Sequence, residues 1–210
     1  MSGIDSPQRA RQALDAFDLL DWVEANRPLM IPPLTNQTIF KGNDNFIVMV
    51  AAGPNPRKDF HYNESEELFL QLQGGLEMGL VVDGRHEARQ VNEGEMFLLP
   101  PRLPHQPRRA PGTYGLVIEK HRVSTDRDAF IWYCEQCQAE LWRVMFLLED
   151  IVQQQPLLQR EFYRSQERRT CDACGHVMQP PEGFEENIAR IEQDNPYVET
   201  NGQAFRGRSW

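Results

Sequence analysis

Short apolar segments, separated by turns rich in glycine and proline, make up much of the chain between residues 37 and 120. In several of them apolar and polar residues alternate, which is typical of strands with one buried face. Asp83-Gly84 lies between two such segments and is a strong signal for a two-residue hairpin turn, because both residues adopt positive φ. The pattern predicts a mainly β protein, folded as a small antiparallel barrel or jelly roll. Its strands are expected at residues 37–40, 45–52, 68–72, 76–82, 95–99 and 114–120.

Helical spacing of apolar residues is confined to the two ends of the chain. Ser6-Pro7 suits a helix start, and the stripe of Leu14, Phe17 and Leu20 predicts a helix over residues 7–26. Toward the C-terminus the pattern predicts a possible strand at residues 140–147, a helix in 151–165 that begins after Pro156, and a short helix at 184–191.

Two histidines and a glutamate lie at the ends of the expected strands. His61 and Glu67 come just before the strand at 68–72, and the hairpin is expected to return His105 toward them. Two imidazoles and one carboxylate that leave other metal positions open are the ligand set of non-haem Fe(II) oxygenases. Glu66 is adjacent, but strand alternation allows only one of the two glutamates to point inward with Phe69.

The spacing of these residues resembles the two cupin motifs, and it selects Glu67. Asn63 stands at the position of the usual second histidine, so four protein ligands become three. Three ligands leave room for dioxygen and for a substrate that binds through two atoms. The first motif comprises His61, Asn63, Glu67 and Gly74, and the second comprises Gly94, Pro100, His105 and Arg109.

Three further polar residues are expected beside this centre. Arg57 lies four residues before His61, Arg109 lies four after His105, and Glu119 is on the next strand. Arg109 faces the same cavity if the segment from His105 is extended. Two guanidinium groups near a metal suit an anionic substrate, because each can hold a carboxylate by two parallel hydrogen bonds.

All four cysteines of the chain fall into two C-x-x-C pairs. Each pair can place both sulfurs on one metal, so together they predict a closed tetrahedral zinc or iron site with a structural role. His176 follows the second pair and is expected to be a neighbour of the site. Four unrelated buried thiols are the alternative, and they do not account for the pairing. The predicted ligands are Cys134, Cys137, Cys171 and Cys174.

Charge and hydropathy narrow the class of protein. With 22 basic and 31 acidic residues the net charge is −9, which argues against nucleic acid as the main partner. No apolar run approaches the roughly 20 residues that span a bilayer, and residues 1–7 have no signal-peptide core. We therefore predict a cytoplasmic protein without a membrane partner. Its expected parts are a helix and barrel at 1–125, a metal-binding region at 126–179 and a tail of unknown role at 180–210.

Several blocks of the sequence, in one order, resemble the 3-hydroxyanthranilate 3,4-dioxygenase family over about residues 17–179. Two cysteine-containing blocks resemble the rubredoxin-type site of its bacterial members: Trp132-Tyr-Cys-Glu-Gln-Cys137 and Arg169-Thr-Cys-Asp-Ala-Cys-Gly175. The barrel blocks are Gly53-Pro-Asn-Pro-Arg-Lys-Asp-Phe-His61, Glu66-Glu67-Leu-Phe, Val82-Asp-Gly-Arg85, Glu93-Gly-Glu-Met-Phe-Leu-Leu-Pro-Pro101, His105-Gln-Pro-Arg-Arg109 and Val117-Ile-Glu119.

The resemblance implies a cupin homodimer that opens the ring of 3-hydroxyanthranilate with O2. The product would be 2-amino-3-carboxymuconate semialdehyde, on the kynurenine route to quinolinate. It also implies catalytic Fe(II) on the predicted triad and Fe or Zn on the cysteines. Two alternatives stay open: a cupin dioxygenase acting on another small substrate, and a non-catalytic metal-binding cupin.

The resemblance also assigns roles to individual residues. It implies that the catalytic Fe(II) is held by His61, Glu67 and His105. The matched substrate-contacting positions are Glu67, Arg109 and Glu119, and Arg57 matches an oxygen-facing one. The catalytic residues implied are Arg57, Arg109 and Glu119, with Asp59 at a supporting acidic position.

Overall fold

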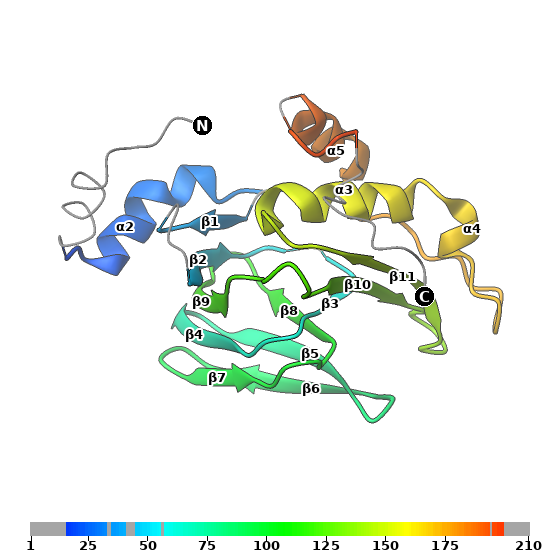
Figure 1. Cartoon of the computed structure of the whole chain (residues 1–210), viewed down its shortest axis with the longest axis horizontal. Helices are drawn as coiled ribbons and strands as arrows, with labels where there is room; N and C mark the ends of the chain where they lie inside the picture. Colours follow the sequence, from blue (N-terminus) through cyan, green and yellow to red (C-terminus); the bar gives the residue numbers. More distant parts are fainter. Residues whose placement is uncertain (1–15, 33–34, 41–44, 56, 194, 200–210) are drawn as a thin grey trace.

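The computed structural model of the protein describes residues 16–32, 35–40, 45–55, 57–193 and 195–199. Its strands form two antiparallel sheets, one in the order β1-β2-β9-β4-β7 and the other in the order β11-β10-β3-β8-β5-β6 (Figure 1). Strands distant in sequence are neighbours in both sheets, which confirms the predicted mainly β jelly-roll barrel of the cupin type. The strands are β1 Asn36–Thr38, β2 Phe46–Ala52, β3 Asp59–Tyr62, β4 Glu67–Gln73, β5 Leu76–Val82, β6 Arg85–Val91, β7 Met96–Leu99, β8 His105–Arg109, β9 Tyr114–Lys120, β10 Asp128–Tyr133 and β11 Glu140–Phe146.

Helices lie on the outside of this barrel. The N-terminal helix α2 packs Val23 against Val50 and Ala52 of β2, while α3 runs along one side of the sheets and contacts α5 (Figure 1). No helix in the described ranges is both long and apolar enough to cross a membrane. The helices are α2 Leu19–Asn26, the short 3-10 helix η1 Arg27–Leu29, α3 Ile151–Tyr163, α4 Gln166–Arg169 and α5 Phe184–Glu192.

The predicted hairpin is present, but it is not the element that brings His105 toward His61. Asp83 and Gly84 have φ values of 49° and 74° and join β5 to β6, as predicted. The strand that carries His105 toward His61 is β8, however, which pairs with the other edge of β5 and with β3. The prediction that the hairpin itself returns His105 was therefore wrong.

Two helix predictions need correction. Residues 16–18 are not helical, and the described helix begins at Leu19, where the Asp18 carboxylate accepts hydrogen bonds from the first-turn N–H groups. The predicted start at Ser6 lies outside the described residues. Helix α3 begins at Ile151, capped by Asp150, so Pro156 lies inside the helix rather than before it.

The strands at 76–82 and 114–120 match the prediction, and the others match within a few residues. Four strands carried no explicit prediction: β3, β6, β8 and β10. The loop between β9 and β10 contains the predicted boundary at residues 125 and 126, and β10 then pairs with β3 in the barrel sheet. The sheet that carries His61 is therefore continued by strands from the C-terminal half of the chain.

Candidate metal centre and its pocket

Three strands, two of them neighbours in one sheet and the third in the other sheet, bring the predicted metal ligands together inside the barrel. His61 of β3 is the direct cross-strand partner of His105 of β8, and Glu67 begins β4. The Glu67 Oε1 atom lies 3.4 Å from His61 Nδ1 and 3.5 Å from His105 Nε2. All three side chains are buried, and their ligand atoms lie within 4.8 Å of one another. Two imidazoles and a carboxylate at these distances fit a divalent cation of the iron type.

The alternation of β4 decides which glutamate enters the site. Glu67, Phe69 and Gln71 point inward and are buried, whereas Glu66 is exposed, as predicted. Asn63 donates a hydrogen bond of 2.6 Å from Nδ2 to Glu67 Oε1. The residue that stands in place of the second cupin histidine therefore holds the carboxylate of the remaining ligand.

A chain of buried ion pairs contacts the side of His61 that faces away from Glu67. The His61 Nε2 atom lies 2.7 Å from Asp128 Oδ2, which also accepts a 2.7 Å bond from Arg122 Nη2. The same Arg122 nitrogen lies 2.8 Å from Glu119 Oε2. Side chains of all three partners are at most 1% exposed. A carboxylate behind a ligating histidine fixes the ring orientation and increases its basicity.

The charges of the centre are strongly coupled. Burial lowers the pKa of His61, but hydrogen bonds to Asp128 and Glu67 outweigh burial and raise the pKa to about 9. Burial raises the pKa of Glu67, yet His105 and His61 together hold it well below its usual range. The His61 imidazole and the Glu67 carboxylate therefore form a buried ion pair, and a cation bound there would displace the imidazole proton.

The pKa of Glu119, on β9, is raised, whereas that of Glu67 is lowered. Glu119 lies opposite Glu67 across the β4–β9 pair, and burial together with the Glu67 charge raises its pKa to about 7. The nearby Arg122 offsets only part of this rise. A carboxyl group with this pKa can gain or lose a proton at neutral pH, which is the property required of a general acid or base.

A pocket opens over the triad and contains the three residues predicted to face the substrate or oxygen, Arg57, Arg109 and Glu119. Arg57 is held by Asp59, with Nη2 2.5 Å and Nε 3.1 Å from Oδ2 of that carboxylate. Segment 105–109 is extended, as β8, so Arg109 reaches the same pocket as His105, as expected.

The Arg109 side chain is buried but incompletely paired. Its Nη1 donates a 2.6 Å bond to Gln71 Oε1, whereas Nε and Nη2 have no hydrogen-bond partner among the described residues. Burial lowers its pKa to about 10, so the guanidinium remains charged at neutral pH. Buried polar groups are nearly always hydrogen-bonded, so two free N–H groups in a pocket indicate a place for a bound anion.

A glycine makes room for this guanidinium. A Cβ atom on Gly115 of β9 would lie 2.6 Å from Arg109 Nη1, 2.7 Å from Nη2 and 2.7 Å from Gln71 Oε1. No real Cβ atom tolerates such contacts, so any larger residue would displace the Arg109 head group.

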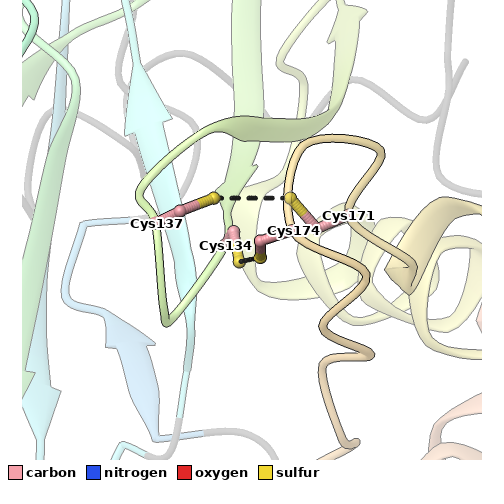
Figure 2. A group of neighbouring side chains, drawn as sticks. All are labelled: Cys134, Cys137, Cys171 and Cys174. Carbon is pink, nitrogen blue, oxygen red and sulfur yellow. Dashed lines mark hydrogen bonds between the residues drawn. The ribbon is translucent and has the colours of Figure 1, made fainter.

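The four cysteines form a second cluster, away from the pocket. Cys134 and Cys137 lie in the loop between β10 and β11, and Cys171 and Cys174 lie in the loop after α4 (Figure 2). The sulfurs of Cys134 and Cys174 are 3.6 Å apart, those of Cys137 and Cys171 are 3.5 Å apart, and all four lie within 4.8 Å of one another. Four thiols gathered from two loops fit a tetrahedral metal site.

The pKa values of the thiols differ within the second cluster. Burial raises the pKa of Cys134, but hydrogen bonds from backbone N–H groups and neighbouring thiols outweigh burial and bring it to about 6. A backbone hydrogen bond lowers the pKa of Cys174, but burial and the neighbouring thiols outweigh it and raise the pKa to about 12. The His176 ring stays outside the set, with Nε2 3.5 Å from Glu135 Oε2.

The sequence matches the family model described as 3-hydroxyanthranilic acid dioxygenase over residues 12–163. The chain belongs to this family. The 3-hydroxyanthranilic acid dioxygenase match spans the triad, Arg57, Arg109 and Glu119, and it also contains Asp128 and Arg122.

Curated relatives are similar over most of their length. A 3-hydroxyanthranilate 3,4-dioxygenase from Xanthomonas campestris pv. campestris is 45% identical over 168 residues, which are 80% of this chain and 94% of the relative. One from Bacillus cereus is 39% identical over 176 residues, 83% of this chain and 97% of the relative. Among solved structures, a cupin-2 domain containing protein from Shewanella frigidimarina has a TM-score of 0.40 at 16% identity. The match covers 52% of this chain and 97% of that protein.

Three residues of the dioxygenase site had no sequence prediction: Gln71, Arg122 and Asp128. Strand alternation was a usable signal for Gln71, since it lies four residues after Glu67 on the same face of β4. No local pattern marks Arg122 or Asp128. Their roles depend on the pairing of β10 with β3, which sets Phe130 opposite His61 and Asp128 beside it.

Proposed function

We propose that the protein is a metal-dependent ring-cleaving dioxygenase that opens 3-hydroxyanthranilate with O2, using Fe(II) held by His61, Glu67 and His105. Membership of the family supports the reaction class. The observation that carries the substrate assignment is the buried Arg109 guanidinium in the pocket over the triad, because two of its nitrogens have no hydrogen-bond partner among the described residues. Its geometry suits the carboxylate of an aromatic acid.

Different pocket side chains would orient the substrate, accept its proton and face oxygen. When bound, Fe(II) would supply a template for the hydroxyl and amino groups of the ring and a path for electrons from the ring to oxygen. Arg109 would orient the carboxylate, with Gln71 fixing the plane of its guanidinium. Glu119, with a pKa of about 7, would accept a proton from the hydroxyl or amino group. Arg57, held by Asp59, would lie on the oxygen-facing side.

The test is turnover by the intact protein. The chain is loaded with Fe(II) without oxygen, mixed with 3-hydroxyanthranilate and exposed to air while the near-ultraviolet absorbance is followed. The proposal predicts a new absorbance from the ring-opened product. Metal-loaded protein that binds no 3-hydroxyanthranilate and yields no product would refute it, and a panel of other aminophenols and thiols would then test the alternative substrates.

We also propose a homodimer, supported by an open apolar face. Most outward side chains of the five-stranded sheet are apolar, and among the described residues α2 packs over those near Val50, Ala52 and Leu116. Phe46, Met96 and Leu98 are 55%, 61% and 57% exposed. Contiguous apolar surface of this kind usually marks a protein interface. The other apolar side chains of this face are half-buried: Val48, Leu68, Leu70 and Ile118.

Leu98→Asp is expected to convert the dimer into a folded monomer, because it places a charge on the apolar face proposed as the interface. Sedimentation velocity at several protein concentrations measures the oligomeric state. Val123→Asp is the matched control, since Val123 is also 50% exposed but lies in a loop outside this face. A dimer of unchanged affinity in the Leu98 variant would place the interface elsewhere.

Gly115→Ala is expected to lower kcat/KM for 3-hydroxyanthranilate by roughly 10- to 100-fold, because the added methyl group pushes Arg109 and Gln71 from their positions. The displaced atoms are the ends of flexible side chains, so the fold should persist. Gly75→Ala is a matched control, since its Cβ would meet only the end of the exposed Gln90 side chain. Steady-state kinetics and thermal unfolding of both variants separate a loss of activity from a loss of stability. Unimpaired kinetics in the Gly115 variant would show that the Arg109 position is unimportant.

Changing Cys171 and Cys174 together to serine is expected to release one metal per chain while ring opening per triad-bound iron is retained. The closed thiolate set leaves no position for substrate, so its contribution is to stability. Each kcal/mol lost should lower the Tm by about 2–4 °C for a chain of this size. Asp172→Ser, in the same loop, controls for the substitution itself. A folded double variant that keeps its triad iron but has lost turnover would mean that the cysteine site takes part in catalysis.

A further inference from the structure

The pocket over the triad is completed by residues that lie outside the barrel, and one set of them also lies outside the family match. Helix α3 contributes Val152, Pro156 and Gln159 to its wall. The chain after residue 180 adds a second set of lining residues: Pro181, Phe184, Asn187 and Ile188. The family match ends at residue 163, so the second set belongs to a segment that the family model does not include.

One face of α5 is turned toward the pocket. Phe184, Asn187 and Ile188 are spaced as i, i+3 and i+4, which places them on the same side of a helix. Phe184 and Ile188 are buried and Asn187 is half-buried, whereas Glu186 and Ala189 are exposed. The helix therefore presents two apolar side chains and one amide to the pocket.

Several contacts fix α5 in this position along its whole length. Phe184 packs edge-on against Tyr163 of α3, with ring centroids 5.0 Å apart. Glu185 lies 2.9 Å from Arg164, and Glu192 lies 2.5 Å from the largely buried Arg160. Beyond the helix, the Asn195 amide donates to the backbone oxygen of Gln153, and the Tyr197 hydroxyl donates to Glu149. The segment is thus a fixed part of the wall, lying against α3 (Figure 1).

Comparison with the length of a relative indicates that this chain contains additional residues. The 168 residues matched to the Xanthomonas campestris relative are 94% of that protein but only 80% of this chain. This chain is therefore longer than that relative, and the structure places residues beyond the family match, which ends at residue 163, at the pocket.

We propose that residues 181–192 cap the entrance of the substrate pocket, and that Phe184, Asn187 and Ile188 determine which small aromatic anions reach the triad. The proposal rests on the proposed function for the identity of the substrate, though not for the existence of the cap. An entrance lined by Phe184 and Ile188 would admit a flat ring with its carboxylate directed to Arg109 and limit substituted rings. It also excludes water from the bound substrate, which strengthens the ion pair at Arg109.

The experiment compares two variants that add the same bulk to opposite faces of α5. Asn187→Phe narrows the entrance, and Ala189→Phe adds the ring on the exposed face as the matched control. A third variant, Ile188→Ala, widens the entrance. Each full-length protein is loaded with Co(II) at the triad, and stopped-flow absorbance measures the association rate of pyridine-2-carboxylate, a small aromatic anion. The Fe(II) forms are assayed with 3-hydroxyanthranilate and with a ring-methylated analogue.

Asn187→Phe should slow association by about 10-fold, while Ala189→Phe should match the unaltered protein. Ile188→Ala should raise the relative kcat/KM for the methylated analogue by about 10-fold, the lower end of the discrimination that one methyl group provides in a pocket. Association rates and preferences equal in all variants, with ring opening intact, would overturn the cap. Association rates that change as expected in a protein that fails to open the ring would uphold the cap and refute the proposed function.

Discussion

Replacing His61, Glu67 or His105 with alanine is expected to abolish ring opening while the barrel stays folded. Each residue supplies one of only three protein ligands, and the three converge within 4.8 Å in a buried site. Metal activation contributes several kcal/mol of transition-state stabilisation, so the expected loss in kcat/KM is on the order of 10³-fold or more. Metal content and turnover are measured together, since loss of iron and loss of turnover should coincide.

Two further variants provide a milder change at the metal centre and a control outside it. Asp128→Asn leaves the three ligands in place but weakens the support of His61, and it should lower metal affinity by roughly 10- to 100-fold. His86→Ala is the control, since His86 packs against Phe60 and Tyr133 and lies outside the triad. A triad variant that retains iron and full activity would remove that residue from the metal centre.

Arg109→Ala should lower kcat/KM for 3-hydroxyanthranilate by roughly 10- to 150-fold. The substrate carboxylate would lose a charge-assisted hydrogen-bonding partner, and such bonds contribute about 1.5–3 kcal/mol. Arg109→Lys should recover little, because a point charge does not reproduce the planar pair of N–H groups. The effect should be specific to the carboxylate, so 2-aminophenol, which lacks it, should be affected much less.

Arg108→Ala is the neighbouring control for this prediction. Arg108 points outward from β8, is 44% exposed and pairs with Glu77 at 2.7 Å. Its removal deletes the same charge one residue away without touching the pocket. Equal losses in the two variants would mean that a general electrostatic effect is responsible, and wild-type kinetics in the Arg109 variants would show that the carboxylate binds elsewhere.

Local chemistry explains which parts of the structure were predictable from the sequence. The Asp83-Gly84 turn needs two residues with positive φ, and few dipeptides adopt that conformation so readily. The inward position of Glu67 follows from strand alternation, because Phe69 must face the core. The cysteine pairs were predictable because the C-x-x-C spacing itself places two sulfurs on one metal.

The features that were missed depend on contacts between distant segments. Strand β3 has only four residues, Asp59–Tyr62, so no periodicity reveals it. Strand β10 is buried at nearly every position, and an apolar run of this length does not distinguish a strand from a buried helix. The roles of Asp128 and Arg122 follow only once β10 is paired with β3. The C-terminal helix was predicted as an element, but its place at the pocket depends on packing against α3.

The central claim is that this chain opens 3-hydroxyanthranilate with one molecule of oxygen at the His61, Glu67 and His105 centre. The most direct measurement is the amount of O2 consumed per ring opened by Fe(II)-loaded protein, combined with the mass of the product. We predict one O2 per ring, a product heavier than the substrate by both oxygen atoms, no hydrogen peroxide, and no reaction in the His61→Ala variant. Iron-loaded protein that leaves the ring intact, or that releases the consumed oxygen as hydrogen peroxide, would contradict the account.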